Sequence, residues 1–221
     1  MKHTTITIDG PAGSGKSTVA RMVAARLGFL YLDTGALYRT AALAIRRSGC
    51  AIEDESSCGA VVARSHIRFS GDRIELGGED VSSEIRSNDI SELASRIASY
   101  PPVRTALLEI QRSFQDISSL VVEGRDTGSV VFPDAAVKIY LDASSAVRAR
   151  RRHDELAGKG VLISYEQVLR DMELRDQRDS TRSSSPLVVP KHAVVVDTTH
   201  RDIDGVVQKI LEIIEQSLPD Q

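Results

Sequence analysis

The chain has 221 residues, of which 41% are hydrophobic and 27% are charged, and its formal net charge is −3. This composition is typical of a globular protein, and one large domain with small insertions accounts for the length. A negative net charge provides no overall basic field, so we expect no binding of nucleic acid. No run approaches the roughly 18 apolar residues of a membrane span, and the N-terminus lacks the apolar segment of a signal peptide. These features predict a cytoplasmic protein that does not bind membranes.

The first element is a short β-branched run at residues 4–8, and a glycine-rich segment follows it directly. Residues 10–17 match the pattern G-x-x-x-x-G-K-[ST]. From Lys16 onward apolar residues recur at helical spacing, and Gly28 supplies a helix stop. A strand, a glycine-rich turn and a helix in this order are typical of a phosphate-binding loop, in which backbone N–H groups surround a polyphosphate.

The loop and the start of its helix are predicted to bind ATP. These residues are Gly10, Pro11, Ala12, Gly13, Ser14, Gly15, Lys16, Ser17 and Thr18. We expect Lys16, at an exposed helix start, to neutralise the β and γ phosphate oxygens and so to act in catalysis. The Ser17 hydroxyl is the predicted Mg²⁺ ligand. The structural alternative is a glycine-rich loop with a solvated lysine.

Strand-like runs alternate with helical stretches along the rest of the chain. The runs lie at residues 4–8, 29–32, 119–122, 137–141 and 193–196. Helices are predicted at residues 36–47, at residues 101–115 and at the end of the chain. The last of these has an apolar stripe of Ile203, Val206, Val207, Ile210, Leu211, Ile214 and Leu218, with Asp202 as its N-cap. The alternation predicts an α/β fold with a three-layer core, in which helices cover both faces of a parallel sheet.

Two stretches depart from this alternation. Residues 64–81 show a period of two with glycine-containing turns, which predicts a small antiparallel meander. Residues 144–170 carry a cluster of arginines followed by two glycines around Lys159. Such a cluster is usually a solvated helix face, but beside a phosphate loop it favours a lid whose Arg148 and Arg151 bind ATP.

Other motifs narrow the class of phosphate-loop protein. The single asparagine, Asn88, is followed by Asp89, so the N-K-x-D guanine reader of GTPases is absent from the sequence. Motor and transporter ATPases need a larger body and a long apolar strand that ends in an acid, and the run ending in Glu123 is the nearest approach. A compact domain with an insert and an arginine-rich lid favours a small-molecule or nucleotide kinase, because closure over both substrates excludes water.

Charged motifs follow the strand-like runs at the edge where ligands bind in parallel sheets. Residues 33–39 follow the second run and residues 123–126 follow the third. A third motif places Arg175, Asp179 and Arg182 on one face of a predicted helix. Two guanidiniums that flank a carboxylate can hold an acceptor phosphate, whereas the alternative is an exposed helix with i,i+4 ion pairs.

Taken together, these motifs closely resemble the bacterial-type cytidylate kinase family over essentially the whole chain. The matching stretches are ITIDGPAGSGKST, LDTGALYR, VSSEIRS, VVEGRDTGSVVFPDA, VKIYLDAS and RDQRD. The resemblance implies a phosphate-loop kinase that transfers the γ-phosphoryl group of ATP to CMP or dCMP. It also implies an enlarged monophosphate-binding insert at residues 49–100, a lid at residues 144–170 and a monomer. The core would comprise residues 1–48, 101–143 and 171–221.

The resemblance also implies roles for individual residues in CMP binding. Thr34, Arg175 and Asp179 would lie near the sugar, Arg39, Arg125 and Arg182 would hold the phosphate, and Ser95, Arg104 and Asp126 would face cytosine. Arg125, Asp126 and Arg182 would join Lys16 in catalysis. The chain departs from the family pattern at two positions, since Thr34 stands where serine is frequent and Glu123 where aspartate is frequent. Another phosphate-loop kinase, for a metabolite, UMP or AMP, and a noncatalytic nucleotide-binding module are the alternatives.

Overall fold

The computed structural model describes residues 3–70, 73–182 and 184–218. The chain forms two compact units. The first unit comprises Met1–Leu32 and Gln115–Gln221, and the second comprises Asp33–Phe114. The division of the chain into a core, a monophosphate-binding insert and a lid stays a prediction.

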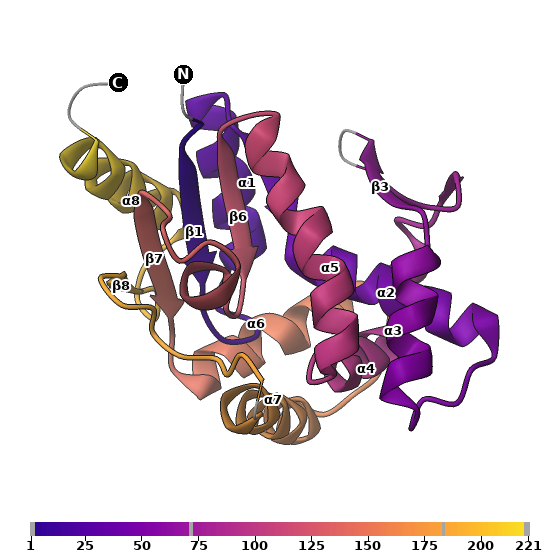
Figure 1. Ribbon diagram of the computed structural model, residues 1–221. Coiled ribbons are helices and arrows are strands. Elements are labelled where there is room, and N and C mark those ends of the chain that lie inside the picture. Colours follow the sequence, from indigo (N-terminus) through magenta and orange to yellow (C-terminus); the bar gives the residue numbers. More distant parts are fainter. Residues whose placement is uncertain (1–2, 71–72, 183, 219–221) are drawn as a thin grey trace. The chain divides into compact units, whose positions relative to one another are not determined.

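A five-stranded parallel sheet is the centre of the first unit (Figure 1). Its strands are β1 (Thr5–Asp9), β2 (Leu30–Asp33), β6 (Leu120–Gly124), β7 (Val137–Asp142) and β8 (Val194–Asp197), in the order β2-β6-β1-β7-β8. The central strand β1 pairs in parallel with β6 and β7, and β7 pairs in parallel with β8. All five predicted strands are confirmed to within two residues.

The sheet is flanked by helices, as the sequence predicted. Ile6 and Ile8 of β1 pack in one apolar cluster with side chains of α1 (Lys16–Leu27) and α8 (Ile203–Ser217). Every residue of β1 is buried, because a central strand of a parallel sheet is covered on both faces. The α/β fold class is therefore confirmed.

The predicted C-terminal end of α1 and the predicted N-cap of α8 are confirmed. Gly28 ends α1 in the left-handed conformation, with φ of 67°, and its N–H donates to the carbonyl of Ala24. Asp202 caps α8 by accepting the N–H of Gly205. One residue of the predicted stripe differs, since Ile203 is 49% exposed. Helical spacing fixes the direction of a side chain but does not specify whether another element reaches the first turn.

Two further helices of the first unit lie beside the phosphate loop. They are α6 (Ser145–Gly158) and α7 (Tyr165–Thr181), and they pack through a separate apolar cluster that includes Ala149, Met172 and the loop residue Ala12. Two short helical segments flank β6 in the sequence. The 3₁₀ turn η2 (Phe114–Asp116) precedes β6, and the π-helix η3 (Thr127–Val131) follows it. The predicted lid segment therefore consists of α6 and the start of α7.

The second unit is mostly helical and contains the predicted meander. Its helices are α2 (Thr34–Ser48), α3 (Glu55–Arg64), η1 (Glu84–Arg86), α4 (Asn88–Ile97) and α5 (Pro101–Ser113). An antiparallel sheet is formed by β3 (Ile67–Ser70), β4 (Arg73–Leu76) and β5 (Glu79–Asp80). Helix α2 begins before the predicted residue 36, because the Asp33 side chain accepts the N–H of Ala36 and caps the helix.

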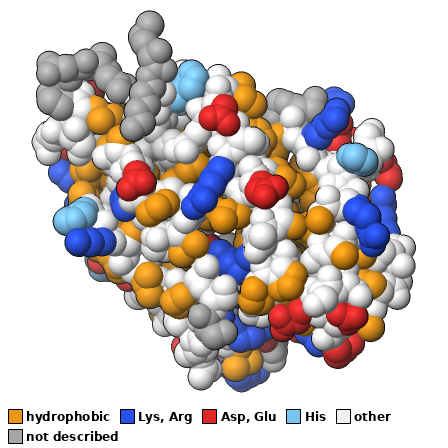
Figure 2. Space-filling view, in the orientation of Figure 1, with side chains coloured by type: hydrophobic (Ala, Val, Ile, Leu, Met, Phe, Trp, Pro, Cys, Tyr) orange, Lys and Arg blue, Asp and Glu red, His pale blue; other side chains and the backbone are white. Residues whose placement is uncertain are grey.

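The described surface carries charges of both signs. On the face shown in Figure 2, lysines and arginines are interspersed with acidic and hydrophobic side chains. Within the described ranges, every helix is too short or too polar to cross a membrane.

The packing of α3 against α5 in the second unit depends on a glycine. A Cβ atom on Gly59 of α3 would lie 2.4 Å from the Cβ of Pro102 and 3.0 Å from the carbonyl carbon of Pro102 on α5. We expect Gly59→Ala to lower the free energy of unfolding by about 1–3 kcal/mol, because the added methyl group forces two packed helices apart.

Urea unfolding followed by circular dichroism measures this change. Gly158→Ala is the matched control, since Gly158 ends α6 and no atom lies within 4 Å of its added Cβ. The control should change the free energy of unfolding by no more than about 1 kcal/mol. Equal unfolding midpoints for Gly59→Ala and the unaltered protein would contradict the packing argument.

Candidate nucleotide-binding site

The phosphate loop connects β1 to α1 and has the backbone geometry of an anion cradle. Gly13 and Gly15 are in the left-handed region, with φ of 74° and 91°. Gly15 is the N-cap of α1, where no side chain caps the helix and no acidic residue lies in the first turn. The N–H groups of that turn therefore lack a competing carboxylate, and they fit the oxygens of a polyphosphate.

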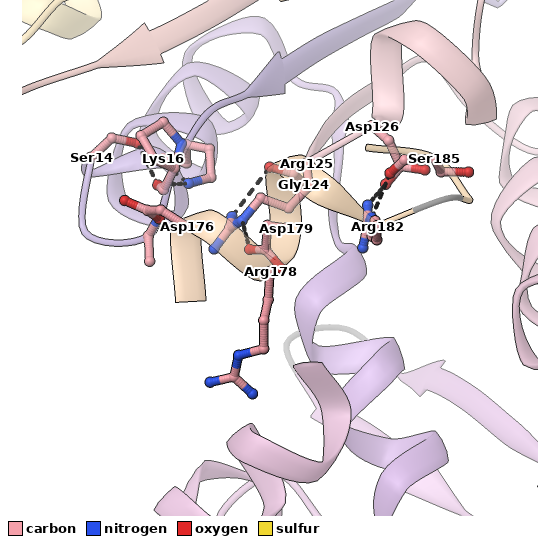
Figure 3. A network of polar contacts seen from close by, with 12 residues as sticks. Ser14, Lys16, Gly124, Arg125, Asp126, Asp176, Arg178, Asp179, Arg182 and Ser185 are labelled. Atoms are coloured by element: carbon pink, nitrogen blue, oxygen red, sulfur yellow. Dashed lines mark hydrogen bonds and ion pairs between the residues drawn. The ribbon is translucent and has the colours of Figure 1, made fainter. Parts of the chain in front are cut away.

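Lys16 lies across the interior of the loop. Its Nζ donates to the carbonyl of Pro11 at 2.6 Å and to the hydroxyl of Ser14 at 3.3 Å, as Figure 3 shows. Lys16 is only 5% exposed, so the expectation of an exposed helix start is wrong. The physical reason is that the side chain reaches back from the first helical turn into the loop, where Pro11 and Ser14 accept its hydrogen bonds.

The burial of Lys16 changes its electrostatics. Burial lowers its pKa well below the ordinary value of 10.5, and the positive charge of Arg125 acts in the same direction. The carboxylate of Glu123 opposes this shift. Since the neutral oxygens of Pro11 and Ser14 compensate little of the charge, anionic phosphate oxygens would be much better partners for this ammonium group.

The segment after β6 lies beside the start of the loop, because β1 and β6 are paired in parallel with Asp9 opposite Gly124. Arg125 donates from Nε to Asp179 of α7 at 3.0 Å. Asp126 accepts a hydrogen bond from Arg182 Nη2 at 3.3 Å. Two ion pairs therefore connect the end of β6 to the end of α7 (Figure 3).

Three of the four side chains in these ion pairs are buried, and Arg125 is partly buried. The side chains of Asp126 and Arg182 are 8% and 7% exposed. Burial acts against the charge of Arg125, but the carboxylate of Asp179 and its hydrogen bond raise the pKa of Arg125 above its ordinary value. The guanidinium groups are therefore fixed as cations at the edge of the sheet where ligands bind.

The helix that carries these partners differs in part from the prediction. Arg175 and Asp179 lie on α7, but the helix ends at Thr181 and Arg182 is its C-cap with an extended backbone. The placement of Arg182 on the same helix is therefore wrong, because the chain turns away there so that Arg182 can meet Asp126. Asp179 is buried, so the alternative of an exposed ion-pair helix is wrong for this carboxylate. Arg178 points away from the network in Figure 3.

Arg148 and Arg151, the two lid arginines predicted to bind ATP, donate hydrogen bonds to other residues of the protein. Arg148 is buried and donates from Nη1 to the carbonyl of Ala12 at 2.9 Å and to Asp176 at 2.6 Å. The other oxygen of Asp176 accepts the N–H of Ala12 at 3.4 Å. Arg151 donates to the hydroxyl and the carbonyl of Thr198. Arg148 and Asp176 thus hold both polar groups of one loop residue.

The remaining predicted site residues belong to the second unit. Thr34 and Arg39 lie on α2, Ser95 on α4 and Arg104 on α5, and both α4 and α5 pack against α2. Arg39 pairs with Asp33 at 3.3 Å. The buried Nε of Arg39 and the buried hydroxyl of Ser95 have no hydrogen-bond partner among the described residues. Buried polar atoms without protein partners are typical of ligand-binding surfaces.

The chain also matches known proteins along its length. The sequence profile of the family described as cytidylate kinase matches residues 6–216. The chain belongs to the cytidylate kinase family. A cytidylate kinase of Chromobacterium violaceum is 48% identical over 96% of this chain and 95% of its own length. One of Cupriavidus necator is 46% identical over 97% of both chains, and one of Caldanaerobacter subterraneus subsp. tengcongensis is 45% identical over 96% of this chain and 95% of its own. This family member is therefore a kinase that phosphorylates nucleotide monophosphates with ATP.

Three acidic residues that hold parts of this site were not among the predicted site residues. They are Asp9 and Glu123, at or near the ends of β1 and β6, and Asp176 on α7. Glu123 is buried and accepts the hydroxyl of Tyr31 at 2.9 Å. Their sequence signal is a carboxylate at the end of a buried strand or within a charged motif, since such a group needs a specific partner. The identity of the partner depends on tertiary structure.

The residues present also fit a divalent cation that is shared with phosphates. No group of three or more His, Cys, Asp or Glu side chains that could hold a metal occurs among the described residues. Mg²⁺ in kinases is commonly held by one or two protein groups together with phosphate oxygens and water. The exposed Ser17, in the first turn of α1, lies in the position for such a group.

The Arg148–Asp176 pair generates a prediction about stability. We expect Asp176→Ala to lower the free energy of unfolding by about 3 kcal/mol, because it leaves the buried Arg148 guanidinium without its carboxylate and releases the N–H of Ala12. Thermal or urea unfolding measures the change. Asp171→Ala is the matched control, since Asp171 is an exposed aspartate of the same helix whose side chain accepts a hydrogen bond from the neighbouring Gln167. Similar losses in both variants would show that the pair contributes no specific stability.

Proposed function

We propose that this kinase transfers the γ-phosphoryl group of ATP to CMP and dCMP, with Mg²⁺, in a single in-line step. One observation carries the proposal. In the first unit, parallel pairing of β1 and β6 places the phosphate loop, with its buried Lys16, beside the cationic segment that begins at Arg125. A donor cradle and acceptor-binding guanidiniums at one sheet edge are the parts that phosphoryl transfer requires.

On the donor side, the loop residues 10–18 would bind the phosphates of ATP, with Arg148 and Arg151 contributing from α6. Lys16 would exchange the carbonyl of Pro11 for phosphate oxygens as the transferred group develops charge. Ser17 would hold Mg²⁺, which supplies further neutralisation of the phosphate oxygens.

On the acceptor side, the proposed phosphate ligands are Arg39, Arg125 and Arg182, because guanidinium groups bind a phosphate dianion with both charge and orientation. The sugar would contact Thr34, Arg175 and Asp179. The base would contact Ser95, Arg104 and Asp126. The Ser95 hydroxyl and the Arg39 Nε support this assignment, since both are buried polar atoms that lack a partner among the described residues and that a nucleotide could satisfy.

The chemistry asks for positioning and charge neutralisation rather than for a side-chain nucleophile. A phosphate oxygen of CMP, which is already unprotonated near neutral pH, attacks the γ-phosphorus, and ADP leaves as the bond between the γ-phosphorus and the β,γ-bridging oxygen breaks. Asp126 therefore orients the acceptor and does not act as a general base. We further propose that residues 49–100 and 144–170 act as the monophosphate-binding insert and the lid, and that the enzyme works as a cytoplasmic monomer.

A panel of acceptors tests the substrate directly. ADP production is measured with ATP and Mg²⁺ and with CMP, dCMP, UMP, AMP or no acceptor. We expect CMP and dCMP to be the preferred acceptors. Preference for UMP, AMP or a metabolite would replace the substrate assignment, and no ADP production with any acceptor would indicate a noncatalytic nucleotide-binding module.

The role of Lys16 gives a second test. Lys16→Ala should lower kcat by about 10²- to 10³-fold, because it removes one strong charge-stabilising contact in the transition state. Lys209→Ala is the control, since Lys209 is an exposed lysine of α8 in the same unit. Circular dichroism should show both variants folded. Unaltered turnover in Lys16→Ala would contradict the proposed chemistry.

The choice of base follows from opposite hydrogen-bond patterns. Cytosine presents an N4 donor and an N3 acceptor, whereas uracil presents an O4 acceptor and an N3 donor. If Asp126 accepts from N4 and Arg104 donates to N3, both contacts become repulsive with uracil. At about 1–3 kcal/mol for each buried unpaired group, kcat/KM for CMP should exceed that for UMP by roughly 10²-fold or more.

Two variants test this assignment. Asp126→Asn should narrow the CMP/UMP ratio because an amide can serve either base, and Arg104→Met should narrow it by removing the donor to N3. Arg112→Met is the control, as Arg112 is an exposed arginine of the same helix α5. An unchanged ratio in both test variants would show that cytosine is recognised by other residues.

A further inference from the structure

Asp9 is a completely buried carboxylate at the end of β1, where the phosphate loop begins beside the segment that follows β6. It is 0% exposed, ends β1 and directly precedes Gly10. One of its oxygens accepts the N–H of Thr127 at 2.9 Å and the hydroxyl of Thr127 at 2.8 Å. The other accepts the N–H of Gly128 at 2.7 Å. All three bonds join the start of the loop to the two residues that follow Asp126.

These bonds satisfy the beginning of the π-helix η3. The first N–H groups of a helix have no partner within the helix, and Asp9 accepts two of them. On the other side, the carbonyl of Asp126 accepts the N–H groups of Val130 and Val131 at 2.9 and 3.2 Å. Short π-helical segments are rare in proteins, but those that occur are often found at functional sites. The backbone position of Asp126 therefore depends on Asp9.

The contact between β1 and η3 is also tightly packed. A Cβ atom on Gly128 would lie 2.6 Å from the hydroxyl oxygen of Thr7 and 3.3 Å from a carboxylate oxygen of Asp9. Burial raises the pKa of Asp9, although the hydrogen bonds from Gly128 and Thr127 oppose the shift. Burying a carboxylate at this position costs free energy, and the three hydrogen bonds to Asp9 offset that cost. Because all three are needed, they also fix the position of Thr127 and Gly128 relative to Asp9.

We propose that Asp9 is a positioning residue for acceptor recognition, which fixes Asp126 relative to the phosphate loop through Thr127 and Gly128. Because Asp9 is covalently joined to Gly10, it connects the donor cradle to the residue assigned to cytosine. The inference rests on the proposed function, and it adds a residue that does not itself touch either substrate.

The test compares base selectivity in three variants. Thr127→Val removes the hydroxyl bond to Asp9 with little change in volume. Asp9→Asn replaces one of the two accepting oxygens with an NH₂ group, which cannot accept, so at least one bond from a backbone N–H group is lost. Thr5→Val is the matched control, since Thr5 is a buried threonine of the same strand whose hydroxyl accepts from Gln115 at 2.7 Å. For each protein we would measure kcat/KM for CMP and for UMP at saturating ATP, the KM for ATP and the melting temperature.

We expect the CMP/UMP ratio of kcat/KM to fall about three- to tenfold in Thr127→Val and further in Asp9→Asn, as expected for losing one or more hydrogen bonds that orient Asp126. The ratio is independent of the fraction of folded enzyme, because both substrates are assayed with the same preparation. A purely structural role would lower the melting temperature and leave the ratio unchanged. The KM for ATP should stay within about twofold in Thr127→Val, since the loop itself is unaltered.

An unchanged ratio in Thr127→Val would overturn the inference, and so would an equal change in Thr5→Val. Should Asp9→Asn fail to fold, Thr127→Val decides the question alone. Wild-type enzyme that does not prefer CMP over UMP would refute the proposed function, and the inference with it. Wild-type preference combined with an unchanged ratio in Thr127→Val would refute the role of Asp9 alone.

Discussion

Parallel pairing of β1 with β6 and β7 is the constraint on which the site depends. Strands that run in the same direction must release their loops at the same edge, so the phosphate loop and the segment after β6 emerge together. The register places Asp9 opposite Gly124, one residue before Arg125. If one strand slipped by one residue relative to the other, its side chains would turn to the opposite face of the sheet, and Arg125 would no longer lie beside the start of the loop.

Around this edge, the first unit buries charges that each require a partner. Lys16 uses neutral oxygens of its own loop, Arg125 uses Asp179, and Arg148 uses Asp176. These contacts fix side chains on α1, α6 and α7 and in the segment after β6 without any substrate. Groups that are fixed in advance need little reorganisation when charge develops in a transition state, which is the main contribution of a protein to phosphoryl transfer.

The partners differ in what a nucleotide would offer them. Lys16 donates to neutral oxygens, which phosphate would replace with charged ones at a gain. Arg125 and Arg182 already contact carboxylates, so a phosphate would have to share them with Asp179 and Asp126. In the second unit, Ser95 and Arg39 each keep a buried polar atom without a partner among the described residues. The chain's membership of the cytidylate kinase family supports the proposal that a nucleotide binds these groups.

The sequence by itself determined the phosphate loop, the five strands, the antiparallel meander and the caps at Gly28 and Asp202. Each of these depends on local spacing or on one residue type, such as glycine in a left-handed conformation. Tertiary structure alone decided the burial of Lys16, the end of α7 before Arg182 and the partners of Asp9 and Asp176. These features join residues that are 28 to 164 positions apart, or depend on how a side chain reaches back into its own loop. A pattern along the chain can show that a buried charge needs a partner, but only the folded backbone determines which residue comes within hydrogen-bond distance.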